Sequence, residues 1–226
     1  MKQQELNEDI IYRLIGESHG SLLHEIYQSP TYLKSRVQDV THSKFISEIE
    51  RNNISYVKYA LLENLIDPSI NDNDAIRCAA RNGYTEIVKL LLEDKRVDPS
   101  TNNNEAIRHA IEKDHTEIVR LVLEDGRVDP SDYDNGAIRC AARNDHIEVV
   151  RLLLKDERVD PSDYNNDAIM WTANRGHIKI LRLLLGDKRV DPSDSNNAPI
   201  REATDNGHTE IVKLLLEDGR VDPNAI

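Results

Sequence analysis

The tripeptide Val-Asp-Pro recurs along this chain at a fixed interval of 31 residues. Its copies begin at Val97, Val128, Val159, Val190 and Val221, and Ile66-Asp67-Pro68 stands one interval earlier. Self-similarity at a period of about 20–50 residues is typical of repeat architectures. We therefore predict six units over 43–226, the first of them divergent. Their expected bounds are 43–69, 70–100, 101–131, 132–162, 163–193 and 194–226.

Each unit is expected to form two short helices and a loop. In Ala75-Ile76-Arg77-Cys78-Ala79-Ala80 the apolar residues fall at i, i+1, i+4 and i+5, which places them on one helix face. Ile87-Val88-Lys89-Leu90-Leu91-Leu92 predicts a second helix that is apolar over more than half of its circumference, and Pro99 prevents its continuation. Because such a pair cannot bury its apolar surface alone, we predict an all-α solenoid of stacked units.

Polar positions that recur between units have structural interpretations. Asn73 and its equivalents precede the first helix, where an amide oxygen is expected to cap free N–H groups. Asp94 and Arg96 and their equivalents are expected to form charge ladders between adjacent units, with partner contact as the alternative. The position after the first helix suits a left-handed cap. It is held by Gly83, Asp114, Asp145, Gly176 and Gly207.

These units resemble ankyrin repeats. The resemblance is carried by the first-helix motif over 74–80, by Gly83-Tyr84 and the second helix over 87–92, and most closely by Pro199 and 206–212 in the last unit. It covers about 180 residues, although the period is 31 where the family has 33. Short units ending in Val-Asp-Pro-Ser are also similar to arrays encoded by large DNA viruses and some protists. The resemblance implies a protein–protein interaction scaffold that binds its partner on a concave face of β-hairpin fingers and first helices.

Positions that differ between units are the candidates for partner contact, because the fixed positions are needed for stacking. Carried over by position from the family, the candidate binding residues are Tyr133, Tyr164, Met170, Trp171, His109, Arg139, Arg143 and Asn174. Tyrosine and tryptophan are the commonest interface anchors. We interpret the two tyrosines as partner contacts rather than covers for loop backbone. Trp171 has two open interpretations, a partner contact or a filler between repeats.

We expect neither an enzyme nor a metal or cofactor site. His115, His146, His177 and His208 recur once per unit. Stacked helices lie about 8–10 Å apart, whereas a zinc ligand lies about 2 Å from its ion, so these residues cannot share one ion. The acidic loop over 160–165 lacks the spacing of an EF-hand. The chain contains no GxxxxGK[ST], GxSxG or HExxH motif.

Charge and cysteine content limit the partners and the compartment. The net charge is 29 − 41 = −12, which disfavours binding to nucleic acid or to an anionic membrane. No apolar stretch approaches the roughly 18 residues of a membrane span, and the first residues show no apolar signal region. Cys78 and Cys140 stand two repeats apart, too far for a disulfide, so free thiols and a cytoplasmic location are expected.

Both ends of the chain differ from the central units. Residues 1–42 do not repeat and carry short apolar stripes, which predict a helical cap over the first repeat. The alternative is a docking element, which would make the chain an adaptor that recruits other machinery, such as a ubiquitin ligase or a host factor, to a target held by the repeats. At the other end, the second helix of the last unit stays apolar over 211–216. We therefore expect this end to fray, self-associate or contact a partner.

Overall fold

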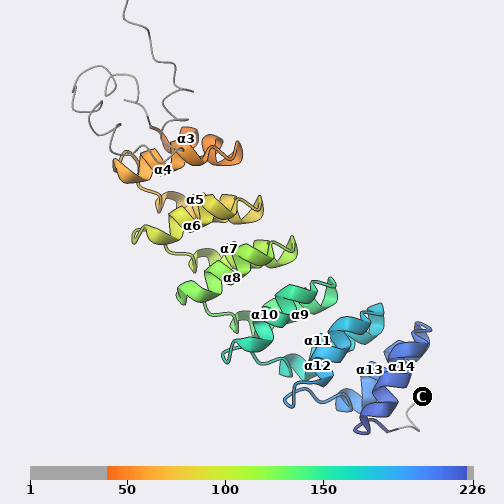
Figure 1. Ribbon diagram of the computed structural model, residues 1–226. Coiled ribbons are helices and arrows are strands. Elements are labelled where there is room, and N and C mark those ends of the chain that lie inside the picture. The colour runs from red at the N-terminus through yellow and green to blue at the C-terminus, as the bar shows by residue number, and fades with distance from the viewer. Residues whose placement is uncertain (1–39, 223–226) are drawn as a thin grey trace, which may run out of the picture. The chain divides into compact units, whose positions relative to one another are not determined.

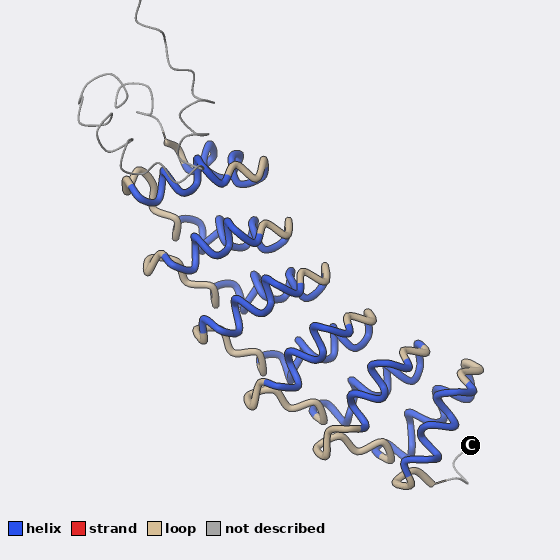
Figure 2. Tube along the Cα trace, viewed as in Figure 1, coloured by secondary structure: helices blue, strands red, loops and turns tan. Residues whose placement is uncertain are grey.

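The structure is a computed structural model that describes residues 40–222, so almost all of the cap expected over 1–42 lies outside the described residues. Within 40–222 the chain forms twelve helices and no strand, which confirms the predicted all-helical class. The described chain divides into two compact units, with the boundary between Thr101 and Asn102. Figures 1 and 2 show the helices as successive antiparallel pairs. None of the helices in this range is long and apolar enough to cross a membrane.

The first unit contains two helix pairs. Helix α3 (His42–Glu50) pairs with α4 (Ile54–Leu62), and α5 (Ile70–Arg81) pairs with α6 (Thr85–Glu93). Helix α3 packs on α5, and α4 packs on α6. The apolar faces predicted from the sequence meet between them, and Ile76, Ile87 and Leu91 are fully buried. Each pair thus covers the apolar surface of the next pair, as the repeat pattern requires.

The second unit contains four helix pairs that are arranged among themselves in the same way (Figure 1). Among the first helices, α9 packs on α11 and α11 on α13, while among the second helices α8, α10, α12 and α14 pack in that order. The core is aliphatic, with Ile138, Leu153 and Ile180 fully buried. The first helices are α7 (Thr101–Glu112), α9 (Asp132–Arg143), α11 (Asp163–Arg175) and α13 (Asp194–Asp205). The second helices are α8 (Thr116–Asp125), α10 (Ile147–Lys155), α12 (Ile178–Leu185) and α14 (Thr209–Asp218).

The loop fingers differ from the β-hairpins that the family resemblance implied. Each finger in 40–222 is a single left-handed turn of three residues at the start of a first helix, and the right-handed helix begins only after it. In α5 these residues are Asn71, Asp72 and Asn73, with φ of 54°, 54° and 58°. The same turn recurs at 102–104, 133–135, 164–166 and 195–197. A turn this compact is consistent with the two residues by which the repeat falls short of the family period.

The expected capping role of the recurring asparagine is wrong. The Asn135 amide oxygen accepts a hydrogen bond from the Asp160 backbone N–H at 2.7 Å, and its nitrogen donates to the Asp163 carboxylate at 2.9 Å. Asp160 lies in the loop before α11, and Asp163 is the first residue of α11. Asn73 and Asn166 make the equivalent bond to backbone N–H groups, at 2.8 Å and 2.7 Å. These asparagines are buried. Their left-handed backbone precedes the right-handed helix, and their side chains join one finger to the loop before the next finger.

The recurring Asp and Arg residues pair within one loop, so the predicted ladder of charges between units is wrong. Arg96 contacts Asp94 through two hydrogen bonds of 2.9 Å and 2.6 Å. The link to the adjacent repeat is instead a hydrogen bond from the Arg96 guanidinium to the Ile66 backbone carbonyl, at 3.2 Å. Arg158 reaches the Val128 carbonyl in the same way, at 2.9 Å. The arginine also holds the pKa of its aspartate below the usual range.

The turn between the two helices of a repeat agrees with the prediction. Gly83, Gly176 and Gly207 have φ of 77°, 81° and 72°, and Asp114 and Asp145 share this left-handed conformation. The histidine that follows Gly176 or Gly207 stands just before the second helix and contacts the preceding repeat. The His208 ring donates to the Asn174 carbonyl at 2.9 Å, and the His177 ring donates to the Arg143 carbonyl at 3.1 Å. Among residues 40–222, no group of three ligating side chains is placed so that it could hold a metal ion.

Candidate protein interface

Tyr133 and Tyr164 occupy the first left-handed position of their fingers, with φ of 58° and 54°. A left-handed backbone costs an ordinary residue roughly 1–2 kcal/mol, and asparagine and aspartate tolerate it best. Asparagine holds the same position in the fingers at Asn71 and Asn102. The tyrosine side chains are 54% and 57% exposed, so burial does not offset the strain. Strain held by a bulky, exposed side chain is typical of a functional position.

Arginine side chains stack on both tyrosine rings. The Arg108 guanidinium lies 5.7 Å from the centre of the Tyr133 ring, and the Arg139 guanidinium lies 4.6 Å from the centre of the Tyr164 ring. Arg139 also donates to the carbonyls of Asp134 and Tyr133 in its own finger, at 3.1 Å and 2.8 Å. Each arginine therefore connects its own first helix to the finger of the next repeat. The stacking fixes the rings before any partner binds, which lowers the entropic cost of association.

A second group of candidates lies between α9 and α11. Trp171 of α11 is half-buried, and its ring centre is 4.5 Å from the guanidinium of Arg143 and 5.8 Å from that of Arg175. These three residues line a cleft of about 330 Å³ together with Gly136, Arg139, Cys140, Asn144 and Asp167. We call it the arginine cleft. Trp171 thus contacts the neighbouring repeat and is also accessible from the cleft, which leaves room for both interpretations of this residue.

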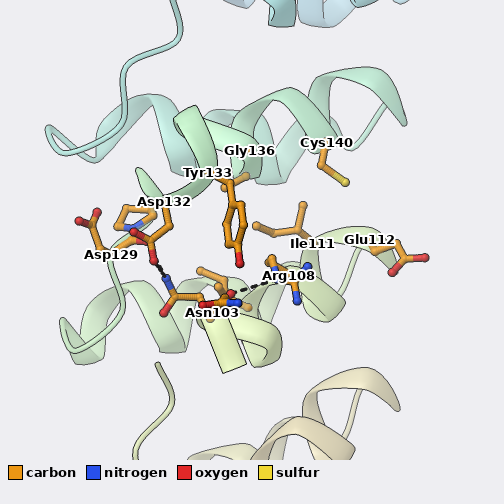
Figure 3. Close-up of a pocket in the computed structure, with 13 residues that line it drawn as sticks. Asn103, Arg108, Ile111, Glu112, Asp129, Asp132, Tyr133, Gly136 and Cys140 are labelled. Atoms are coloured by element: carbon orange, nitrogen blue, oxygen red, sulfur yellow. Dashed lines mark hydrogen bonds between the residues drawn. The ribbon is translucent and has the colours of Figure 1, made fainter. Parts of the chain in front are cut away.

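A more apolar cleft of about 310 Å³ lies between α7 and α9 (Figure 3). Its walls include the aliphatic side chains of Ile107 and Ile111 and the small residues Gly136 and Ala137. Tyr133 and Arg108 line the same cleft, and Figure 3 shows the tyrosine ring extending from α9 toward Arg108. We call it the apolar cleft. It shares Gly136 and Cys140 with the arginine cleft, so the two depressions adjoin each other along α9.

Gly136 explains why the apolar cleft opens at this repeat. The equivalent position carries Asp74, Glu105, Asp167 and Ala198 in the other repeats, so only here is the side chain missing. A Cβ atom at Gly136 would approach the Tyr133 Cβ to 3.3 Å. In the next repeat Asp167 lies in the arginine cleft and its carboxylate is 3.3 Å from Arg139. Gly136 was not among the residues predicted from the sequence, although a comparison of the repeats position by position contains the signal.

The remaining candidates lie apart from both clefts. His109 is half-buried on α7 with its ring 3.6 Å from Glu105. Asn174 donates to the Glu202 carboxylate in the next repeat at 2.7 Å. Met170 is half-buried on α11, and Tyr164 extends the surface through its stacking on Arg139. The structure therefore brings Tyr133, Arg139, Arg143 and Trp171 together around the two clefts and adds Arg108 and Arg175, which the sequence analysis did not single out.

Both cysteines are free thiols, as predicted. Cys140 lines both clefts, and burial raises the pKa of its thiol above the ordinary value. Burial raises the pKa of the Cys78 thiol in the same way. A raised pKa lowers the thiolate fraction at neutral pH, and the thiolate is the reactive form. Cys140 therefore contributes to the clefts as a small apolar surface rather than as a nucleophile.

A family model for ankyrin repeats, containing three copies of the repeat, matches residues 46–134, 76–165 and 138–226. Ankyrin repeats are generally protein–protein interaction modules, and proteins built from them are typically non-enzymatic scaffolds. A comparison with curated proteins found no match. Because the family matches together span 46–226, which is most of the sequence, this chain belongs to the ankyrin repeat family.

Proposed function

We propose that this chain is a non-enzymatic scaffold that binds another protein on the surface formed by α7, α9, α11 and their fingers. The observation that carries the proposal is the pair of exposed tyrosines at Tyr133 and Tyr164, which keep a strained left-handed backbone where asparagine would be relaxed. Their stacking on Arg108 and Arg139 presents two rigid rings to solvent. Rigid aromatic anchors of this kind dominate the free energy of protein–protein association.

The rigid attachment of this surface also supports a scaffold rather than a catalyst. The helices that carry it are held to their neighbours by buried asparagines and by arginine contacts to backbone carbonyls. The surface is therefore ordered before binding, and few side chains lose freedom when a partner associates. We place the scaffold in a reducing intracellular compartment, which agrees with its two free cysteines.

Affinity purification with the full chain tests the proposal. Proteins captured by the natural chain are compared with those captured by a triple variant, Tyr133→Ala, Tyr164→Ala and Trp171→Ala. A direct partner is expected to be lost from the variant, because two or three anchors worth about 2 kcal/mol each are removed. The matched control is Tyr84→Ala, since the Tyr84 hydroxyl donates to the Glu50 carbonyl in the other compact unit. Capture that is equal in all three samples would contradict the proposed surface.

A further inference from the structure

We propose that the partner segment bound at α9 is an extended peptide with one apolar and one acidic anchor about three residues apart. One anchor is a large apolar side chain in the apolar cleft at Gly136. The other is an aspartate or glutamate carboxylate that binds Arg143 and Arg175 in the arginine cleft. This inference rests on the proposed function and specifies the chemistry of the partner that the surface would select.

The apolar cleft selects an uncharged side chain. Its volume is about 310 Å³, and an apolar cavity of about 150 Å³ is already enough to bind benzene. Three carboxylates, Glu112, Asp129 and Asp132, line it against one guanidinium, that of Arg108, so the charge of the lining is net negative and repels an anion. Ile107, Ile111 and Ala137 form apolar parts of the wall, which favour the burial of aliphatic or aromatic surface. An apolar side chain is therefore favoured here over an acidic one.

The arginine cleft selects a carboxylate. Arg139 is already paired with Asp167, but Arg143 and Arg175 have no carboxylate within ion-pair distance among residues 40–222. Both are exposed, and both lie beside the Trp171 ring. Two unpaired guanidinium groups in a chain of net charge −12 form a local cationic site. Guanidinium groups bind carboxylates through paired, charge-assisted hydrogen bonds.

The distance between the anchors follows from the repeat. The apolar cleft lies between α7 and α9, and the arginine cleft lies between α9 and α11. Adjacent packed helices are separated by about 8–10 Å, and an extended peptide advances about 3.3 Å per residue. A segment crossing α9 therefore passes from one cleft to the next in about three residues. The expected motif is a large apolar residue and an acidic residue separated by two others, in either chain direction.

A random peptide library displayed on phage tests this motif against the immobilised full chain. Enriched peptides are expected to contain the apolar–acidic pair at a separation of about three positions. Synthetic peptides with the enriched sequences are then titrated against two variants. Gly136→Asp fills the apolar cleft, and Arg143→Glu with Arg175→Glu reverses the charge of the arginine cleft. Each variant is expected to lose about 10- to 100-fold in affinity.

The variants are chosen to remain folded. Asp167 follows Tyr164 at the same spacing as Gly136 follows Tyr133, so the fold already accommodates aspartate beside a finger tyrosine. By repeat symmetry, an aspartate at 136 would face Arg108 as Asp167 faces Arg139. Arg143 and Arg175 are exposed, so charge reversal leaves the core intact. A peptide in which lysine replaces the acidic residue is expected to regain affinity for the charge-reversed variant.

Several results would overturn the inference. They are the absence of any enriched peptide, enriched peptides without the pair, and peptides that bind both variants as tightly as the natural chain. A phosphoserine peptide that binds more tightly than its glutamate counterpart would also overturn the assignment to a carboxylate. If enriched peptides ignore Gly136, Arg143 and Arg175 but fail to bind when Tyr133 and Tyr164 are replaced, the inference fails and the proposed function stands. Peptides that need the clefts but not the tyrosines support the inference and count against the tyrosines as anchors.

Discussion

Replacing Tyr133 and Tyr164 with asparagine is expected to weaken partner binding while leaving the fold as stable as before or more stable. Asparagine occupies the equivalent left-handed position at Asn71 and Asn102, so the change reproduces a solution that the chain already uses. The left-handed strain relieved is up to roughly 1–2 kcal/mol per site. The exposed cation–π contacts with Arg108 and Arg139 that are lost are worth about 0.5–1 kcal/mol each.

These opposing terms set the expected size of the effect. The free energy of unfolding should stay unchanged or rise by up to about 1 kcal/mol per site. Little buried surface is lost, because the tyrosine side chains are 54% and 57% exposed. Partner binding should fall by at least about 2 kcal/mol, which is roughly 30-fold in Kd. The variant therefore moves stability and affinity in different directions, which truncation of an ordinary core residue cannot do.

Urea unfolding followed by the fluorescence of Trp171, the single tryptophan of the chain, measures the stability. Isothermal calorimetry against the captured partner measures the affinity. The matched control is Ser195→Asn, because Ser195 holds the same finger position with φ of 51° in the last repeat. This control should gain stability without changing the affinity. A Tyr133→Asn/Tyr164→Asn variant that loses stability and keeps its affinity would show that the tyrosines are structural and refute the reasoning.

Three further predictions follow from contacts within the repeats. Asn135→Ala should destabilise the fold by about 2–4 kcal/mol, because it leaves the Asp160 N–H without its acceptor. Urea unfolding measures the loss, and Asn165→Ala on the exposed part of the next finger is the control. An equal loss in both variants would contradict the role assigned to Asn135. Arginine contacts hold the pKa of Asp156 below the unfolded-state value of about 3.8, as they do for Asp94. Stability should therefore be constant above that value and fall as pH drops through the lowered folded pKa. Urea midpoints between about pH 5 and pH 2 measure this, and a midpoint insensitive to pH would contradict it. In hydrogen-exchange measurements on dilute monomer, the amides of 209–218 should exchange faster than those of 147–156, because Leu216 of α14 is 37% exposed. Their exchange should slow on association. Equal protection of both segments in a monomer would show that α14 is adequately covered.

The helix pairs and the turns between them were predictable from the sequence because they depend on local patterns. The apolar spacing over 75–80 identifies one face of α5, and Gly83 marks the left-handed cap after it. The fingers were not predictable in the same way. Three consecutive left-handed residues are rare, and the Asn-rich stretch over 71–73 was interpreted as a cap for the following helix instead. Its actual partners lie about 25 residues further along, where no local pattern indicates them.

The candidate site was predicted in part, for a related physical reason. Tyr133, Arg143 and Trp171 were found because they differ from the residues at equivalent positions in other repeats. The clefts were not predicted because an opening between two helices depends on a missing side chain. The missing side chain at Gly136 is recognised only when all repeats are aligned. The pairing state of each arginine also depends on three-dimensional distances. Arg139 has a carboxylate partner within 40–222 and Arg143 has none, although both stand on the same helix.

Several contacts that recur between neighbouring repeats end on main-chain atoms. Arg158 and Arg220 reach the carbonyls of Val128 and Val190, Asn135 accepts from a backbone N–H, and His208 donates to a carbonyl. Every residue type except proline offers these same main-chain groups. At these contacts a repeat can be duplicated, deleted or exchanged in steps of 31 residues without a compensating change of side chain. The outward-facing positions are then free to diversify by mutation one repeat at a time, which makes such an array a substrate for rapid evolution of new binding surfaces.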